Sequence, residues 1–176
     1  TLIIRPDDSV AVFNLDDILC GASKCMPNLL AVDIFVPQQY VLSSRGYLGF
    51  GSDGDERKQF VLTADGIRDF FREVHGTLQS FSFRLDECCW DIVKSKTDHG
   101  KAFLALGTMP NLKKLYFSHV GFDDIQVLMR CLNPNLKVLS LSNVKLRSSS
   151  WCREDASIVT STLRKMTKLI TLDLSA

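Results

Sequence analysis

A repeat in the middle of the chain constrains the possible folds more than any other feature. The segment PNLKKLYFSHVGF, residues 110–122, superimposes on PNLKVLSLSNVKL, residues 134–146, after a shift of 24. Each copy alternates apolar and polar residues, the pattern of a strand with one buried face. A unit of this size cannot bury its own apolar face, so neighbouring units must stack with their strands side by side. The repeat therefore predicts one continuous core.

The same strand pattern recurs along the rest of the chain. The sequence of residues 26–29, Met-Pro-Asn-Leu, reappears letter for letter at 109–112, and proline at this point ends a helix and turns the chain into a strand. The spacings between equivalent strand positions are 30, 49, 34, 24 and 33 residues. Most exceed the usual ~20–29 residues of such repeats, so we expect helices and insertions between the strands. The six equivalent positions are Leu2, Val32, Phe81, Leu115, Leu139 and Leu172.

The segments between the strands contain apolar residues at helical spacing. The clearest of them starts at residues 63–65, Thr-Ala-Asp, and stops before Gly76. A shorter helix is expected around residues 103–106. The expected inward residues of the longer helices are Leu15, Ile18, Leu19, Ala22 and Met26; Ile67, Phe70, Phe71 and Val74; Ile125, Leu128, Met129 and Leu132; and Ala156, Val159, Leu163 and Met166.

Residues 37–62 interrupt this rhythm with a stretch rich in Gly and charge, and we expect an insertion loop there. Within it, residues 49–54 match the G-x-G-x-x-G pattern of phosphate-binding turns. The surrounding βαβ unit is missing, and Asp55 and Glu56 would repel phosphate, so the match indicates loop glycines. Long loops often carry binding residues, so a contribution to binding at the rim of the sheet stays open.

The charge and hydropathy of the chain exclude several classes of function. There are 21 Lys and Arg against 20 Asp and Glu, and no basic run, so nothing indicates a nucleic-acid partner. No apolar stretch reaches the roughly 18 residues that span a bilayer, and the N-terminus lacks the pattern of a signal peptide. We therefore expect a soluble protein of the cytoplasm or nucleus, with no membrane partner.

No residue pattern indicates catalysis or a bound cofactor. The adjacent Cys88 and Cys89 lack a second Cys or His pair at zinc-ligand spacing. None of the three histidines is accompanied by a nucleophile and a carboxylate at a recognisable spacing. We expect no metal, no cofactor and no enzymatic activity. Four cysteines in or beside helical segments are expected to be reduced thiols, namely Cys20, Cys25, Cys131 and Cys152.

The residues between the inward leucines of each strand point to the opposite face, because side chains alternate across a strand. If the strands lie side by side in sequence order, Phe35 falls between Arg5 and Arg84, with Tyr116 nearby. An aromatic ring flanked by guanidinium groups is the composition of an interface hot spot. A solvated sheet face with one cation–π contact is the alternative. The candidate partner-binding residues are Arg5, Asp33, Phe35, Arg84, Lys114 and Tyr116.

Three features of the chain resemble the leucine-rich repeats of F-box proteins and, more broadly, the ribonuclease-inhibitor-like class. They are the Pro-Asn-Leu-x-x-Leu-x-Leu motif, the Val-x-Phe or Val-x-Leu that ends each central copy, and the long units of irregular length. The resemblance covers nearly the whole of residues 1–176. It implies an α/β fold, a leucine-rich-repeat solenoid with a curved parallel sheet on the concave side and helices on the convex side. Val120 and Val144 depart from the family pattern, which often has Asn or Cys there.

In that family the repeats hold a substrate protein while an F-box recruits a ubiquitin ligase through an adaptor. No F-box and no capping unit is recognisable, so we expect part of a longer array, without a second domain in these residues. The expected function is binding of a protein or peptide on the concave face, as in the substrate-recognition part of such a receptor. A scaffold or sensor with no ligase connection and a GTPase-activating protein are the alternatives.

Overall fold

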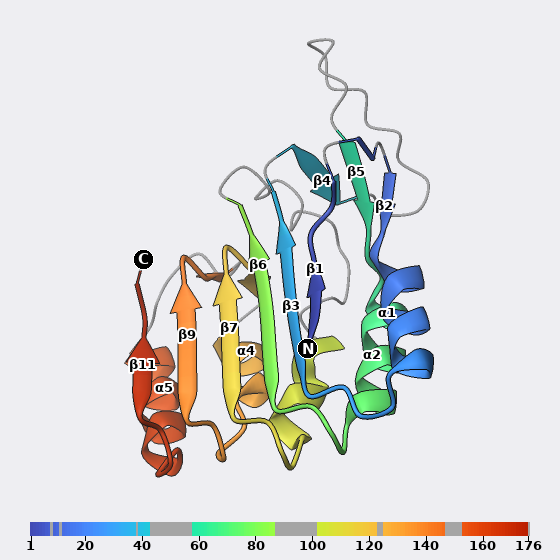
Figure 1. Ribbon diagram of the computed structural model, residues 1–176. Coiled ribbons are helices and arrows are strands. Elements are labelled where there is room, and N and C mark those ends of the chain that lie inside the picture. The colour runs from blue at the N-terminus through green and yellow to red at the C-terminus, as the bar shows by residue number, and fades with distance from the viewer. Residues whose placement is uncertain are drawn as a thin grey trace, which may run out of the picture.

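The main feature of the structure, a computed structural model, is a six-stranded parallel sheet. The strands of this sheet lie in the order in which they occur in the chain, so each inner strand pairs with the one before it and the one after it (Figure 1). The strands are β1 (Leu2–Ile4), β3 (Ala31–Val36), β6 (Ser80–Leu85), β7 (Lys114–Ser118), β9 (Val138–Ser142) and β11 (Thr171–Asp173). The structure describes residues 1–7, 9–10, 12–37, 39–42, 58–86, 102–122, 125–146 and 153–175.

The register of the sheet follows the sequence repeat. The six positions expected to be equivalent are neighbours from strand to strand, for example Phe81 beside Leu115 and Leu115 beside Leu139. Backbone hydrogen bonds just before the strands repeat in the same way, since the Lys137 amide donates to the Lys113 carbonyl at 2.7 Å. The prediction of adjacent strands in sequence order is confirmed, because a polar-apolar alternation with a fixed repeat admits a single stacking register.

Helices cover one face of this sheet. Figure 1 shows α4 (Ile125–Cys131) and α5 (Arg153–Lys165) behind β7, β9 and β11, and α1 (Leu15–Cys25) packed against α2 (Ala64–Val74) at the β1 side. The short helix expected near residue 103 is the 3₁₀ helix η2 (Phe103–Thr108). Its Phe103 ring lies 5.2 Å from that of Phe117 and 5.6 Å from that of Phe83, so helix and sheet share one core.

The helical pattern identified most of the inward side chains. All four expected residues of α2 are buried. Two expectations are wrong: Met26 is 38% exposed, because α1 ends at Cys25 and Met26 only caps it, and Ala156 is exposed. Ala156 belongs to α5, which packs against α4 but has no helix on its other side within the described ranges.

The insertion at residues 37–62, expected to be a loop, contains two strands, so that expectation is wrong for these parts. β4 (Tyr40–Leu42) and β5 (Lys58–Val61) form a three-stranded parallel sheet with β2 (Val12–Asn14). Tyr40 is fully buried and its hydroxyl donates to the carbonyls of Asp7 and Val10, both at 2.8 Å. Apolar side chains inside the polar stretch therefore reach the core. The G-x-G-x-x-G stretch at 49–54 lies outside the described residues.

A second small sheet continues two of the main strands. β8 (Gly121–Phe122) pairs with β10 (Lys145–Leu146) in parallel. The chain turns from β7 into β8 and from β9 into β10 through residues with positive φ, His119 and Asn143. Both lie in the left-handed region, in which Asn and His are enriched among non-glycine residues.

The start of α2 is tied to α1 by one carboxylate. The Thr63 side chain caps α2 by accepting from the Gly66 amide at 3.0 Å. Asp16 in the first turn of α1 accepts from the Thr63 amide at 3.0 Å and from its hydroxyl at 2.7 Å. A Cβ at Gly66 would lie 2.1 Å from an Asp16 carboxylate oxygen, so only glycine allows this approach.

Candidate functional site

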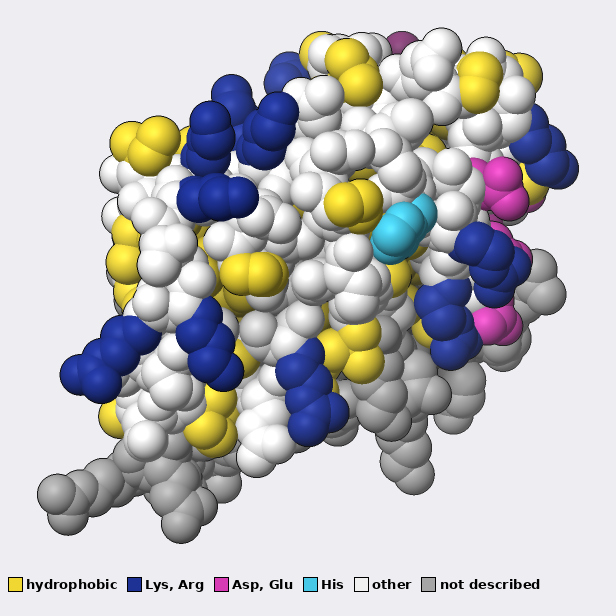
Figure 2. Space-filling model, turned by 90° about the horizontal axis from the view of Figure 1, so that it is seen from below, with side chains coloured by type: hydrophobic (Ala, Val, Ile, Leu, Met, Phe, Trp, Pro, Cys, Tyr) yellow, Lys and Arg dark blue, Asp and Glu magenta, His cyan; other side chains and the backbone are white. Residues whose placement is uncertain are grey.

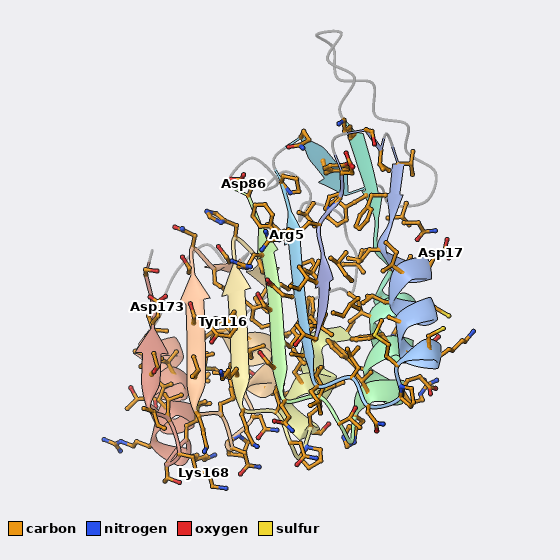
Figure 3. The ribbon with its side chains drawn as sticks, in the orientation of Figure 1. Arg5, Asp17, Asp86, Tyr116, Lys168 and Asp173 are labelled. Carbon is orange, nitrogen blue, oxygen red and sulfur yellow. The ribbon has the colours of Figure 1, made fainter. Side chains whose placement is uncertain are left out.

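The face of the main sheet opposite the helices, called here the open face, carries the candidate residues. The inward side chains of β3, β6, β7 and β9 are buried, whereas those on the open face are mostly half-buried or exposed. Phe35 lies directly beside Arg84 in the register, and Asp33 lies in one row with Ser82 and Tyr116. The strand alternation thus places the candidate residues on one surface. In Figure 3, Tyr116 lies on β7, Lys168 lies where the strands begin and Asp86 where β6 ends.

An ion pair joins two neighbouring strands on this face. Arg84 Nη2 of β6 donates to both carboxylate oxygens of Asp33 on β3, at 2.9 and 2.7 Å. Arg5 Nη2, after β1, is 4.0 Å from the same carboxylate. Hydrogen bonds between ionised groups are roughly twice as strong as neutral ones. The pair therefore joins β3 to β6 through side chains as well as through the backbone.

The surroundings of Asp33 favour its charged form. Partial burial by itself raises the pKa of this carboxyl group. The hydrogen bonds from Ser82 and Arg84, together with the positive charges of Arg84 and Arg5, outweigh that effect and hold the pKa below its ordinary value. Asp33 is therefore a carboxylate at neutral pH.

Arg84 also contacts the aromatic side chain of the site. Its guanidinium carbon lies 5.9 Å from the centre of the Phe35 ring, within the range of a cation–π interaction. The expectation that Phe35 and Arg84 lie together is confirmed. Arg84 Nε is buried and has no hydrogen-bond partner among the described residues. One guanidinium group thus holds Asp33, covers Phe35 and retains an unused N–H donor.

A shallow depression of about 330 Å³ opens beside this pair. Asp33, Arg84 and Tyr116 are among the residues that line it, together with Ser80 and Ser82. Three of the six candidate residues therefore surround one hollow. The other three lie around it: Phe35 under the Arg84 guanidinium, Arg5 beside Asp33, and Lys114 exposed at the start of β7.

The sequence interpretation missed the Asp33–Arg84 pair and the two serines. Sequence reasoning paired residues directly opposite each other on adjacent strands, and Asp33 lies opposite Ser82, whereas Arg84 lies opposite Phe35. Diagonal neighbours on adjacent strands are also within reach of a long side chain. The sequence signal for the pair was an acid, Asp33, on one strand and a base, Arg84, two residues beyond the opposite position on the next strand. Ser82 is 8% exposed and gives no comparable sequence signal.

The groups weighed for other chemistry lie elsewhere. Cys20 and Cys25 are exposed free thiols, and burial raises the pKa of the Cys131 thiol to about 12, so Cys131 is protonated at neutral pH. No three His, Cys, Asp or Glu side chains gather as metal ligands in the part of the chain that the structure describes. Nor, within the same ranges, is any helix long and apolar enough to cross a membrane. Cys88, Cys89, His99 and Cys152 lie outside the described residues.

The fold and this surface define a mixed α/β protein whose parallel sheet is covered by helices on one face and presents charged, aromatic and hydroxyl side chains on the other. In comparisons with family models, with curated proteins and with solved structures, no match to the chain was found.

Proposed function

We propose that the protein is a leucine-rich-repeat solenoid of the ribonuclease-inhibitor-like class, and that its open face binds a partner protein or peptide. The 24-residue repeat supports the proposed solenoid. The Asn133 side-chain amide donates a hydrogen bond to the Met109 carbonyl, and these two residues are 24 positions apart, the same spacing as the sequence repeat. The sequential order of parallel strands, with helices returning behind them, supports it as well. An interaction protein without catalytic activity is the function that this arrangement favours.

The observation that carries the binding proposal is the depression lined by Asp33, Arg84 and Tyr116, together with the Arg84 Nε that has no hydrogen-bond partner among the described residues. A buried donor without an acceptor is rare in folded proteins and costs about 1–3 kcal/mol. This Nε is covered as it stands, so a backbone carbonyl oxygen of a bound peptide would satisfy it once the Arg84 side chain turns toward the hollow. Tyr and Arg are also the residue types that dominate binding energy at protein interfaces. The depression is shallow, which suits a peptide or a protein surface more than a small molecule.

The resemblance to F-box proteins suggests which partner to seek. In that proposal the bound protein is a ubiquitin-ligase substrate, and an F-box outside these residues contacts the ligase adaptor. A scaffold without such a connection would use the same face, so the two proposals differ in the adaptor. Co-purification of a cullin-ligase adaptor with the full-length protein separates them.

The test is affinity purification with the full-length protein and a variant carrying Phe35→Ala and Tyr116→Ala. We expect the variant to lose a specific set of captured proteins, because two aromatic anchors of the open face are removed. Arg68→Ala, an exposed change on α2, serves as the matched control and should retain them. Each captured protein is then titrated against the purified wild type and the purified double variant. Equal affinities for the wild type and the double variant would rule out the open face as the binding surface.

A further inference from the structure

A groove between α4 and α5 lies on the helical side of the molecule, away from the open face. Its volume is about 430 Å³, within the usual range for binding pockets. A buried floor is formed by Met129 in α4, Leu132 just after α4 and Met166 just after α5, and Ile158 adds a half-buried wall. Methionine side chains adapt to different partner shapes. The groove is thus an apolar hollow between two helices.

The rim of this groove is positively charged. Arg130 in the last turn of α4 and Lys165 in the last turn of α5 both line it and are both exposed. Among the described residues that line it, none is Asp or Glu. Neither cation takes part in an ion pair within the described ranges, in contrast to Arg68 and Arg72 of α2, which pair with Asp65 and Asp69.

The fold gathers more cations at the same end of the molecule. The strands of the main sheet are parallel, and β7, β9 and β11 each begin at the end of the molecule where the preceding helix ends. The residues just before these three strands therefore lie at the same end as the last turns of α4 and α5. Figure 2, which views this end, shows Lys and Arg without acidic neighbours over its left and centre, while at the right-hand margin Lys and Arg lie beside Asp and Glu. The helix macrodipole accounts for cations in last helical turns. It does not account for those in the turns before strands, which are Lys113, Lys137 and Lys168.

We infer that the α4–α5 groove binds an acidic amphipathic helix of a partner protein. Its apolar side chains enter the hollow above Met129, Leu132 and Met166, and its carboxylates meet Arg130 and Lys165. Charge complementarity selects this occupant, because two cations without an ion pair among the described residues flank an apolar floor. An amphipathic helix in a hydrophobic groove is a common mode of peptide recognition. A nucleic acid would leave the apolar floor unused.

The test uses a designed peptide as the probe. A peptide of about 15 residues, long enough to form a marginal helix, carries Leu at i, i+3, i+4 and i+7 and Glu at most other positions. A matched peptide carries Gln in place of each Glu. Fluorescence anisotropy with the whole chain should show binding of the Glu peptide that weakens at high salt, and binding of the Gln peptide at least about tenfold weaker, a difference of ~1.4 kcal/mol.

Variants locate the binding to the groove. The double variant Arg130→Glu and Lys165→Glu changes two exposed side chains, so the fold should be retained, and we expect it to lose the Glu peptide. The control is Lys24→Glu, which reverses an exposed cation in the last turn of α1. It should bind the peptide as the wild type does, as should the open-face variant Tyr116→Ala. Equal binding by the Arg130→Glu, Lys165→Glu variant and the wild type would overturn the proposal.

Two further outcomes also count against it. If neither peptide binds, or if both bind equally, the groove has no preference for acidic helices. If the Glu peptide fails but vesicles containing phosphatidylserine, or a single-stranded oligonucleotide, bind the wild type and not the Arg130→Glu, Lys165→Glu variant, the cations serve a lipid or a nucleic acid. A negative result for the groove would not contradict the proposed binding on the open face, because the two surfaces share no residue.

Discussion

Asn143 repeats the backbone conformation of His119, with φ of 51° and 55° at equivalent positions of the two central repeats. The amide of His119 donates to the Ser142 carbonyl at 3.0 Å, and the amide of Asn143 donates to the Ser175 carbonyl at 2.8 Å. Each left-handed residue thus connects its own unit to the following one. The repeat therefore reproduces a turn with its hydrogen bond, in addition to the buried leucines.

Replacing Asn143 by alanine should destabilise the protein by about 1 kcal/mol, because a Cβ without a polar group disfavours the left-handed region. Asn143→Gly should have the stability of the wild type or slightly more, since glycine enters this region freely. Urea unfolding of both variants measures the difference. Equal stability of the Ala and Gly variants would contradict the assignment of a left-handed turn.

Gly66→Ala should destabilise the protein by roughly 2–3 kcal/mol, because its Cβ would displace the Asp16 carboxylate from the Thr63 cap of α2. Gly21→Ala is the matched control. It also lies within a helix, but a Cβ there meets nothing within 4 Å, so it should stabilise the protein by about 0.5–1 kcal/mol. Thermal or urea unfolding compares the two.

A double variant checks the cause of the Gly66 effect. With Asp16→Ala present, Gly66→Ala should cost much less than it does in the wild type, because the clashing carboxylate is gone. Additive effects would show that the strain arises from another contact.

The pH dependence of stability should contain a contribution from Asp33. Its pKa is lowered in the folded state, so this contribution is present above the ordinary carboxyl pKa of about 3.9 and is lost as the pH falls through the lower folded value. We expect Arg84→Met to move the Asp33 pKa upward, as followed by NMR titration of the carboxyl carbon. An unchanged Asp33 pKa in Arg84→Met would refute the ion pair as a cause of the shift.

Leu139→Ala and Leu172→Ala test the stacking of equivalent strand positions. Leu139 is fully buried between β7 and β11, and its truncation should cost about 3 kcal/mol. Leu172 occupies the same position on the outer strand β11 and is 44% exposed, so its truncation should cost about 1 kcal/mol. Equal losses in urea unfolding would show that the two leucines do not differ in burial as the sheet order requires.

The main sheet could be read from the sequence because repeat and alternation act together. Leu115 and Leu139 occupy equivalent positions, and only one register places both in the same core. The burial of Phe70 and Phe71 in α2 followed from helical spacing in the same way. The pairing of Phe35 with Arg84 then required nothing beyond the order of the strands.

The remaining features depend on contacts that periodicity does not encode. Tyr40 is buried because its hydroxyl reaches two carbonyls about 30 residues earlier in the chain, at Asp7 and Val10. The Asp33–Arg84 pair depends on the reach of an arginine side chain across one strand. The α4–α5 groove depends on how closely two helices approach, which the apolar stripe of each helix alone does not determine.

The sequential order of the strands has a consequence for how such a gene can change length. Lys114 lies beside Val138, one repeat of 24 residues further along the chain. An in-frame duplication of residues 114–137 would insert a second copy of β7, β8 and α4 between neighbours of the same kind. The copied strand would pair with β7 on one side and β9 on the other in the register that β7 and β9 already use, so the main sheet could gain a strand without a change in its hydrogen-bonding pattern.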